Sequence, residues 1–389
     1  MKATINKHTL SQICDHYGVT NEYLALRVKC TPEQILQWKS SHCDDLPSMT
    51  QAKVLAKSLR IPLASLYFEP ANFHFEKLPR LTNKRAIGEG CVDDFSIVNL
   101  AVLDLLNLRS LVLEIEEHLK IQHNVFNISI DADLGAKKYA STLRHALQIS
   151  RADQKAAKSP RQFFLLIRQS IERLGVLVAG FSGVDVSVLR GIAVSPGKIP
   201  VIGFNEEDSY SAKSFTLIHE LVHIISHQSV ACNDFASFAH DSTEVFCNSV
   251  AGNFLVPEES LLSEKEIVIL HKEGKTIDVS DLRRIASRYS VSREVITRRM
   301  FDLGLLTQDQ YDAYVATFAQ QLAERRAKQS KSSFGGRDMG RALFDKNGYM
   351  VTGALFAGVN SGLYSTLDVS DFLGTRIRNV NKVFGEYSG

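Results

Sequence analysis

Apolar residues recur at helical spacing along most of the chain, whereas strand-like runs are confined to one short region. Residues 132–149 and 160–174 have the three-to-four-residue period of helices that bury one face. Short apolar runs follow at 175–181, 191–194 and 199–204, and glycine or proline residues separate them. Residues 215–225 then have the composition of a buried helix. This order predicts a mostly helical α+β fold with a small sheet before a buried helix.

The last of the short apolar runs, 199–204, is expected to form an edge strand beside the buried helix. An edge strand has unpaired backbone N–H and C=O groups, which can bind an extended peptide by strand addition. The hypothesis that follows is that residues 199–204 hold a peptide substrate.

Residues 1–70 have the pattern of several short helices. One helix is expected to start near Thr31, because its hydroxyl can cap the helix and Pro32 is favoured in the first turn. The helix, about Thr31–Lys39, would present side chains able to contact DNA: Gln34, Gln37 and Lys39. The segment is only slightly basic, however, and phosphate neutralisation dominates DNA affinity. A domain that docks a protein or dimerises fits the pattern nearly as well.

Residues 281–305 predict two further helices joined by a Tyr-Ser-Val-Ser turn. Their apolar positions keep helical spacing, and their arginines are expected to lie largely on the outside. The candidates for contact with DNA or a protein partner are Arg293, Arg298 and Arg299. A solvated charged face is the usual alternative for such helices, and the sequence leaves both interpretations open.

The rest of the chain connects these parts. Residues 92–122 are densely apolar and predict a long helix or a pair of helices. Residues 321–341 are basic and rich in Ser and Gly, as linkers are. The expected division is into a helical domain (1–70), a connector (71–125), a core (126–275), a helix pair (276–320), a linker (321–341) and a small C-terminal module (342–389).

The composition is that of a globular protein with more than one domain. The chain has 389 residues and a formal net charge of +2, so no overall attraction to nucleic acid follows. Its six cysteines form no CxxC pair, which favours free thiols in a reducing compartment. The N-terminus lacks an apolar signal core, and no apolar run is expected to reach the length of a membrane span. We therefore expect a cytoplasmic protein.

The most informative motif lies in the buried helix and has the form HExxH. His219 and His223 are four residues apart, so both imidazoles project from the same helix face and can bind a single metal ion. Glu220 lies beside the first histidine, where a carboxylate can take a proton from a water activated by the metal. Chance can also produce this motif, so the prediction depends on a third ligand.

A third ligand is predicted downstream. Residues 244–257 predict a second amphipathic helix, and Glu244 on it can bind the metal, while Asn248 on the same face can hydrogen-bond to a ligand histidine. His227 follows His223 by another four residues, but the helical twist carries it away from the face that His219 and His223 share. Two thiols lie near the motif, and buried structural roles are favoured for both: Cys232 and Cys247.

Together these residues resemble the ImmA/IrrE family of metallopeptidases. The resemblance is carried by Asn205, the HExxH helix, and the run Glu244-x-x-Cys-Asn248-x-x-Ala251-x-x-Phe-Leu-Val-Pro257. It is specific across about 199–257 and fainter over 131–198. Cys247 and Val250 stand where the family more usually has Ala and Phe, and these differences leave the ligands untouched.

The resemblance implies a zincin-like core in which His219, His223 and Glu244 bind zinc and Glu220 is the catalytic base. It also implies a partner protein as substrate, typically a transcriptional repressor cleaved in stress response or mobile-element regulation. Residues 1–70 resemble the XRE-type helix-turn-helix domain that often precedes such cores. Residues 281–305 resemble the helix-turn-helix-like subdomain that follows them, and longer members carry a comparable C-terminal piece.

The predicted function is therefore zinc-dependent hydrolysis of a peptide bond. Zinc is favoured by the ligand set, although two histidines and a carboxylate also suit Mn²⁺ or Fe²⁺. A second oxyanion donor is expected, and neither Tyr210 nor His240 can be assigned to it. The alternative function is a DNA-binding regulator or antitoxin-like protein whose zincin core only binds a partner. The intact glutamate of the motif argues against that alternative.

Overall fold

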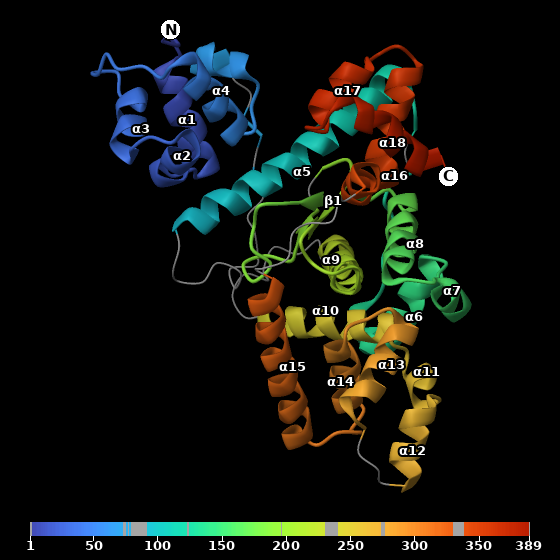
Figure 1. Cartoon of the computed structure of the whole chain (residues 1–389). Coiled ribbons are helices and arrows are strands. Elements are labelled where there is room, and N and C mark those ends of the chain that lie inside the picture. The colour runs from blue at the N-terminus through green and yellow to red at the C-terminus, as the bar shows by residue number, and fades with distance from the viewer. Residues whose placement is uncertain are drawn as a thin grey trace. The chain divides into compact units, whose positions relative to one another are not determined.

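The structure is a computed structural model that describes residues 2–72, 75–76, 78, 92–122, 124–195, 197–229, 240–273, 277–329 and 338–388. The described chain is mostly helical with one three-stranded sheet, which confirms the predicted α+β fold (Figure 1). It forms two compact units. The first comprises Met1–Leu113, Gly180–Ile192 and Asn205–Glu207, and the second comprises Glu114–Ala179, Ala193–Phe204 and Asp208–Gly389.

The first unit opens with short helices packed around a common core. These are α1 (Lys7–Tyr17), α2 (Asn21–Val28), α3 (Pro32–Lys39) and α4 (Met49–Ser58), followed by the 3-10 turns η1 (Leu63–Tyr67) and η2 (Pro70–Asn72). The predicted start of α3 is confirmed, because the Thr31 hydroxyl accepts a hydrogen bond from the Gln34 N–H and the Gln34 side chain accepts one from the Thr31 N–H. Trp38, only 2% exposed, lies at the centre of the helices.

Helix α5 (Val92–Leu119) is the long helix predicted for residues 92–122. Its N-terminal half packs on the short helices, where the Ser96 hydroxyl donates to Gly18 O and the Asn99 amide donates to Tyr17 O. The expectation that no apolar run reaches the length of a membrane span is wrong for this helix. By length and composition alone, Phe95–Leu119 is long and apolar enough to cross a membrane, and half of its most apolar stretch is buried within the structure.

The second unit is built around three helices, each packed against the next. Its elements up to the sheet are η4 (Ala132–Leu134), α6 (Gly135–Ala146), α7 (Arg151–Ala156) and α8 (Pro160–Arg173). The predicted helices at 132–149 and 160–174 are thereby confirmed. Helix α8 packs against α9 (Tyr210–Ser229), and α9 packs in turn against α10 (His240–Leu255) (Figure 1). One apolar cluster joins these three helices to the sheet.

The sheet corrects one prediction. Its strands are β1 (Leu177–Phe181), β2 (Gly191–Val194) and β3 (Val201–Asn205), in the order β1-β3-β2. The N–H of Leu177 bonds to Pro200 O on one side of β3, and the N–H of Asn205 bonds to Arg190 O on the other. The prediction of an edge strand at 199–204 is therefore wrong, and strand addition there is excluded. All five residues of β3 are buried, which is typical of a central strand.

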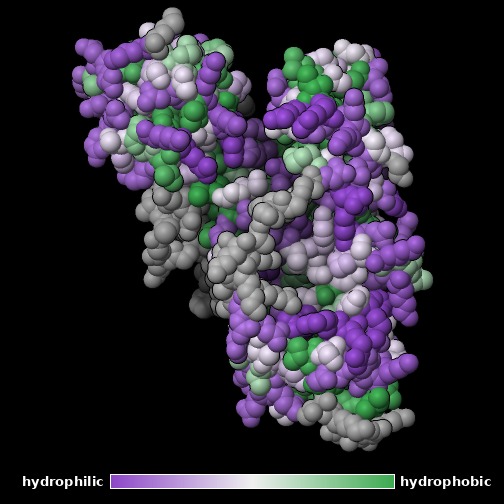
Figure 2. Space-filling model, viewed as in Figure 1, coloured by the Kyte–Doolittle hydropathy of each residue, from purple (hydrophilic) through white to green (hydrophobic). Residues whose placement is uncertain are grey.

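A helical subdomain follows α10. It contains α11 (Glu258–Leu262), α12 (Lys265–Glu273), α13 (Val279–Tyr289), α14 (Arg293–Asp302) and α15 (Gln308–Gln329). The predicted helix pair at 281–305 is confirmed as α13 and α14, joined at Ser290, whose left-handed backbone ends α13. On the face seen in Figure 2, α11 to α15 present a largely hydrophilic surface with small apolar patches.

The C-terminal module consists of α16 (Met339–Asn360), α17 (Thr366–Phe372) and α18 (Ile377–Ser388). It packs on α8, and a break in α16 marks the contact. At the break, Gly348 has φ +71° and ψ −168°. The guanidinium of Arg168, which is fully buried, lies so close to Gly348 that a Cβ there would overlap it. Only glycine can adopt this positive φ readily and also leave room for the Arg168 guanidinium.

Gly348→Ala is expected to destabilise the protein by about 2–3 kcal/mol or more, because strain from the positive φ adds to the overlap with Arg168. Gly374→Ala is the matched control: Gly374 has φ +58°, but a Cβ there would meet nothing within 4 Å, so about 1 kcal/mol is expected. Denaturant unfolding of both variants measures the difference. Equal losses of stability would show that the Arg168 contact does not constrain Gly348.

Candidate metal centre

Helix α9 places the HExxH motif inside the core of the second unit. Apolar residues surround the motif on the helix and are all fully buried: Leu217, Ile218, Leu221, Val222, Ile224 and Ile225. His219 and His223 are 8% and 7% exposed, and Glu220 is 4% exposed. Burying three ionisable side chains in apolar surroundings is costly unless each has a partner. The partner of the two histidines comes from another helix.

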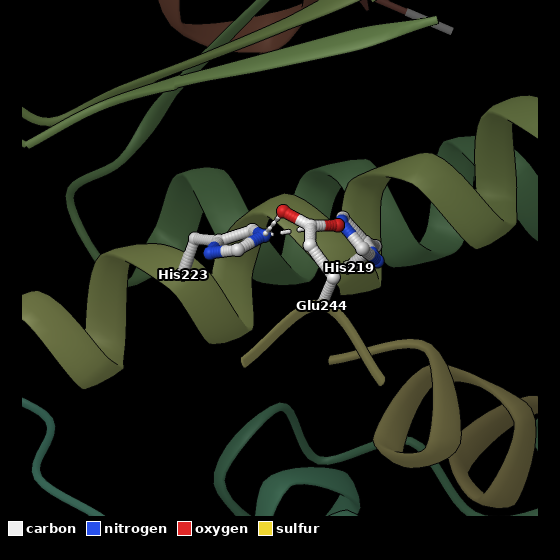
Figure 3. A group of neighbouring side chains, drawn as sticks. All are labelled: His219, His223 and Glu244. Carbon is white, nitrogen blue, oxygen red and sulfur yellow. Dashed lines mark hydrogen bonds and ion pairs between the residues drawn. The ribbon is translucent and has the colours of Figure 1, made fainter. Parts of the chain in front are cut away.

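Glu244 of α10 lies between the two imidazoles (Figure 3). One carboxylate oxygen is 3.2 Å from His219 Nε2 and the other is 3.2 Å from His223 Nε2. The two Nε2 atoms are 3.1 Å apart. The structure thus brings together the three residues predicted as metal ligands, from two helices whose packing fixes their separation.

The electrostatics of the two glutamates differ. Burial alone would raise the pKa of Glu244, but hydrogen bonds and charge interactions with His219 and His223 outweigh it and hold the pKa well below its usual range. Burial raises the pKa of Glu220 to about 7; interaction with His223 lowers it and that with Glu244 raises it. Glu244 is therefore ionised and fit to bind a cation, while Glu220 can exchange a proton near neutral pH.

The three side chains fit a divalent metal ion. Their donor atoms lie within 4.8 Å of one another. In a tetrahedral site with metal–donor bonds of about 2.0–2.1 Å, neighbouring donors lie about 3.3 Å apart. The two Nε2 atoms, 3.1 Å apart, are close to this value, and each lies 3.2 Å from a different oxygen of the Glu244 carboxylate. Two imidazoles and one carboxylate leave a fourth position for water or substrate.

The structure does not support the role predicted for Asn248. Its side chain is exposed, because the buried face of α10 is formed by its neighbours Cys247, Val250, Ala251 and Phe254. Within the described chain, Nδ1 of His219 is buried without a hydrogen-bond partner. Asn248 therefore forms no hydrogen bond with this nitrogen of His219.

Other candidates near the motif are placed as follows. Cys247 is a free, fully buried thiol in the apolar cluster and is not part of the ligand group, as the sequence favours. The hydroxyl of Tyr210 donates to Asp345, so it is not turned toward the motif as an oxyanion donor. Cys232 and the side chains of His227 and His240 lie outside the described residues.

The side chains proposed to contact DNA from α3 are mostly engaged within their own domain. Gln34 completes the helix cap, and Lys39 Nζ donates to the Asn21 side chain at 3.2 Å. Gln37 is exposed. The largest exposed apolar side chains on α2 and α3 are Leu26 and Leu36, at 76% and 58% exposure.

Of the arginines on α14, Arg299 is not on the outside, and the prediction is wrong for it. It is 4% exposed, donates to Asn253 and to Val256 O, and lies against Gly252, where a Cβ would be 3.1 Å from Arg299 Cδ. Arg299 therefore joins α14 to the end of α10. Arg293 stacks on Phe318 and donates to Gln321. Arg298 pairs with Asp302 and is the most exposed of the three arginines.

Asn205, to which the sequence assigns no separate role, holds the loops around the sheet. It is fully buried, donates to the carbonyls of Val184 and Leu189, and accepts from the N–H of Glu207. A polar residue at the end of an apolar strand is the signal that could have identified this role.

Part of the chain is similar to a known protein family. Residues 171–301 match the family model described as the IrrE N-terminal-like domain, a peptidase family. The match covers α9, α10 and nearly all of α14, and it supports a metallopeptidase of the IrrE/ImmA type, which implies a divalent metal. No curated protein and no solved structure matches the chain.

Metal affinity separates the roles of Glu244 and Asn248. Glu244→Ala removes a ligand and should weaken binding of Zn²⁺ by more than about 100-fold, whereas Asn248→Ala should leave it within about threefold, since its side chain is exposed. Competition with a chromophoric chelator measures both affinities. A tenfold loss in Asn248→Ala would restore the hydrogen-bonding role predicted from the sequence.

Proposed function

We propose that this protein is a zinc-dependent endopeptidase of the ImmA/IrrE type that hydrolyses a peptide bond in a partner protein. The observation that carries the proposal is the convergence of His219, His223 and Glu244, with Glu220 next to the first ligand on the same buried helix. The donor set favours zinc, and it also suits Mn²⁺ or Fe²⁺.

The chemistry divides between the ion and the protein. A bound divalent ion supplies Lewis acidity, which lowers the pKa of a water and polarises a carbonyl. Glu220 acts as the general base: its carboxylate takes a proton from the attacking water and delivers it to the leaving amine. Its burial keeps the pKa high enough for both steps near neutral pH, although a nearby cation lowers that pKa. His219, His223 and Glu244 hold the ion.

The substrate we propose is a transcriptional repressor, which the family resemblance implies. An XRE-type N-terminal domain that docks a protein is favoured over one that reads DNA, since Gln34 and Lys39 are engaged internally while Leu26 and Leu36 are exposed. Action in the cytoplasm is supported by the free thiols of the described cysteines: Cys14, Cys30, Cys43 and Cys247.

Glu220→Gln tests the mechanism. The variant should keep its metal, because the ligands are unchanged, and should lose cleavage by about 10²- to 10⁴-fold, because the amide cannot accept the proton. The measurement is mass analysis of regulators encoded beside the gene after incubation with the zinc-loaded protein. Glu259→Gln, on an exposed ion pair with Lys137, is the control and should cleave normally.

Retained cleavage by metal-loaded Glu220→Gln would contradict the assignment of the base. If no regulator is cleaved and Glu220→Gln retards promoter DNA in a salt-dependent manner, the regulator function replaces the peptidase function.

A further inference from the structure

Helix α16 is broken at the point where it meets α8, and α8 caps both halves of the break. Arg168 donates to the carbonyls of Asp345 (2.5 Å) and Lys346 (3.1 Å), which end the first half. Glu172 accepts from the N–H of Tyr349 (2.9 Å), which begins the second half, and pairs with Arg168 at 3.2 Å. Two charged residues one helical turn apart on α8 thus satisfy backbone groups that the break would leave unpaired.

Beside this break, the carboxylate of Asp345 joins three helices. Arg161 of α8 donates to it through two nitrogens, at 2.8 and 2.6 Å. The Tyr210 hydroxyl donates to it at 2.5 Å. Asp345 is 6% exposed, and Arg161 also pairs with Glu386 of α18 at 3.3 Å. A two-nitrogen arginine–carboxylate contact with little solvent exposure is strong and directional.

Tyr210 is the first residue of α9, the helix that carries His219 and His223. Its ring packs on Phe164 of α8, with centroids 5.6 Å apart. His219 lies nine positions after Tyr210 along the helix, roughly 13 Å at 1.5 Å per residue. A tilt of about 5° over that length would displace an end by about 1 Å, whereas metal ligands must be placed within about 0.2 Å. Apolar packing is non-directional, so a directional bond at the start of α9 restricts such tilts.

We propose that Asp345 of the C-terminal module is a positioning residue for the metal centre, because it binds Tyr210 in the first turn of α9 while Arg161 of α8 holds its carboxylate in place. The C-terminal module then contributes to the geometry of the metal centre. This inference rests on the proposed function, since it requires that His219 and His223 bind metal.

Two variants of the full chain test the proposal. Asp345→Asn removes the charge that holds Arg161, and Tyr210→Phe removes a single hydroxyl while the Arg161–Asp345 pair and the ring packing remain. Tyr210→Phe is therefore expected to fold even if Asp345→Asn does not. Glu259→Gln, which disrupts an exposed pair on α11, is the matched control.

Two readouts separate positioning from stability. Hydrogen exchange followed by mass spectrometry reports on residues 208–218, and titration with Co²⁺, followed by its visible absorption, reports on the metal centre. Asp345→Asn should speed exchange at 208–218 and weaken Co²⁺ binding about tenfold, and Tyr210→Phe about threefold. The double variant should weaken Co²⁺ binding by less than about thirtyfold, the product of the two single effects, because both changes act on one connected cluster. Glu259→Gln should change neither readout.

Unchanged exchange at 208–218 in both variants would overturn the anchoring of α9. Faster exchange with Co²⁺ affinity within twofold of the parent would overturn the positioning role and leave a contact that only stabilises. If the parent protein itself fails to bind Co²⁺, the proposed function fails, and the exchange data still decide whether Asp345 anchors α9.

Discussion

The contact between the Glu244 carboxylate and the imidazoles of His219 and His223 is the constraint on which the site depends. It joins α9 and α10 beside the apolar cluster of the second unit. Three polar donors so close together in low-dielectric surroundings are a poor substitute for apolar packing, and they are well suited to a cation. The surrounding helices and sheet hold these three donor groups at these distances from one another.

Three sets of contacts hold α9, α10 and the elements packed near them. Apolar residues of α8, α9, α10 and the sheet form one cluster and set the distances between the helices. Buried arginines then fix the helix ends: Arg299 holds the end of α10 from α14, and Arg168 holds the break in α16 from α8. Each arginine satisfies backbone carbonyls that helices leave unpaired at their ends. The last support is the Asp345 cluster at the start of α9.

Much of this could be predicted from the sequence, because helical periodicity and HExxH spacing are local signals. The helices at 160–174 and 281–305 and the joining of His219 and His223 follow from such spacing. Glu244 was predicted from its place on a second amphipathic helix, and the motif shared with a known family agrees with that prediction. Strand order was missed because chain order places 199–204 last, whereas pairing depends on long-range contacts. The fully apolar composition of that run was the available clue.

The side chains that were misplaced share one physical reason. Arg299 and Asn248 are polar residues on helices, and periodicity assigns such residues to the solvent or to a neighbour without knowing which helix packs there. Arg299 is buried because Gly252 leaves room for it on α10. Asp345 carried no local signal, since its partners Arg161 and Tyr210 are 184 and 135 residues away in the chain.

X-ray absorption at the zinc K-edge of the purified, zinc-loaded protein tests the central claim most directly, because it reports the ligands themselves. We expect one zinc per chain with nitrogen and oxygen donors at about 2.0–2.1 Å and the outer-shell signature of two imidazoles. A sulfur shell at about 2.3 Å, or a single imidazole, would contradict the assignment of His219, His223 and Glu244 as the ligands.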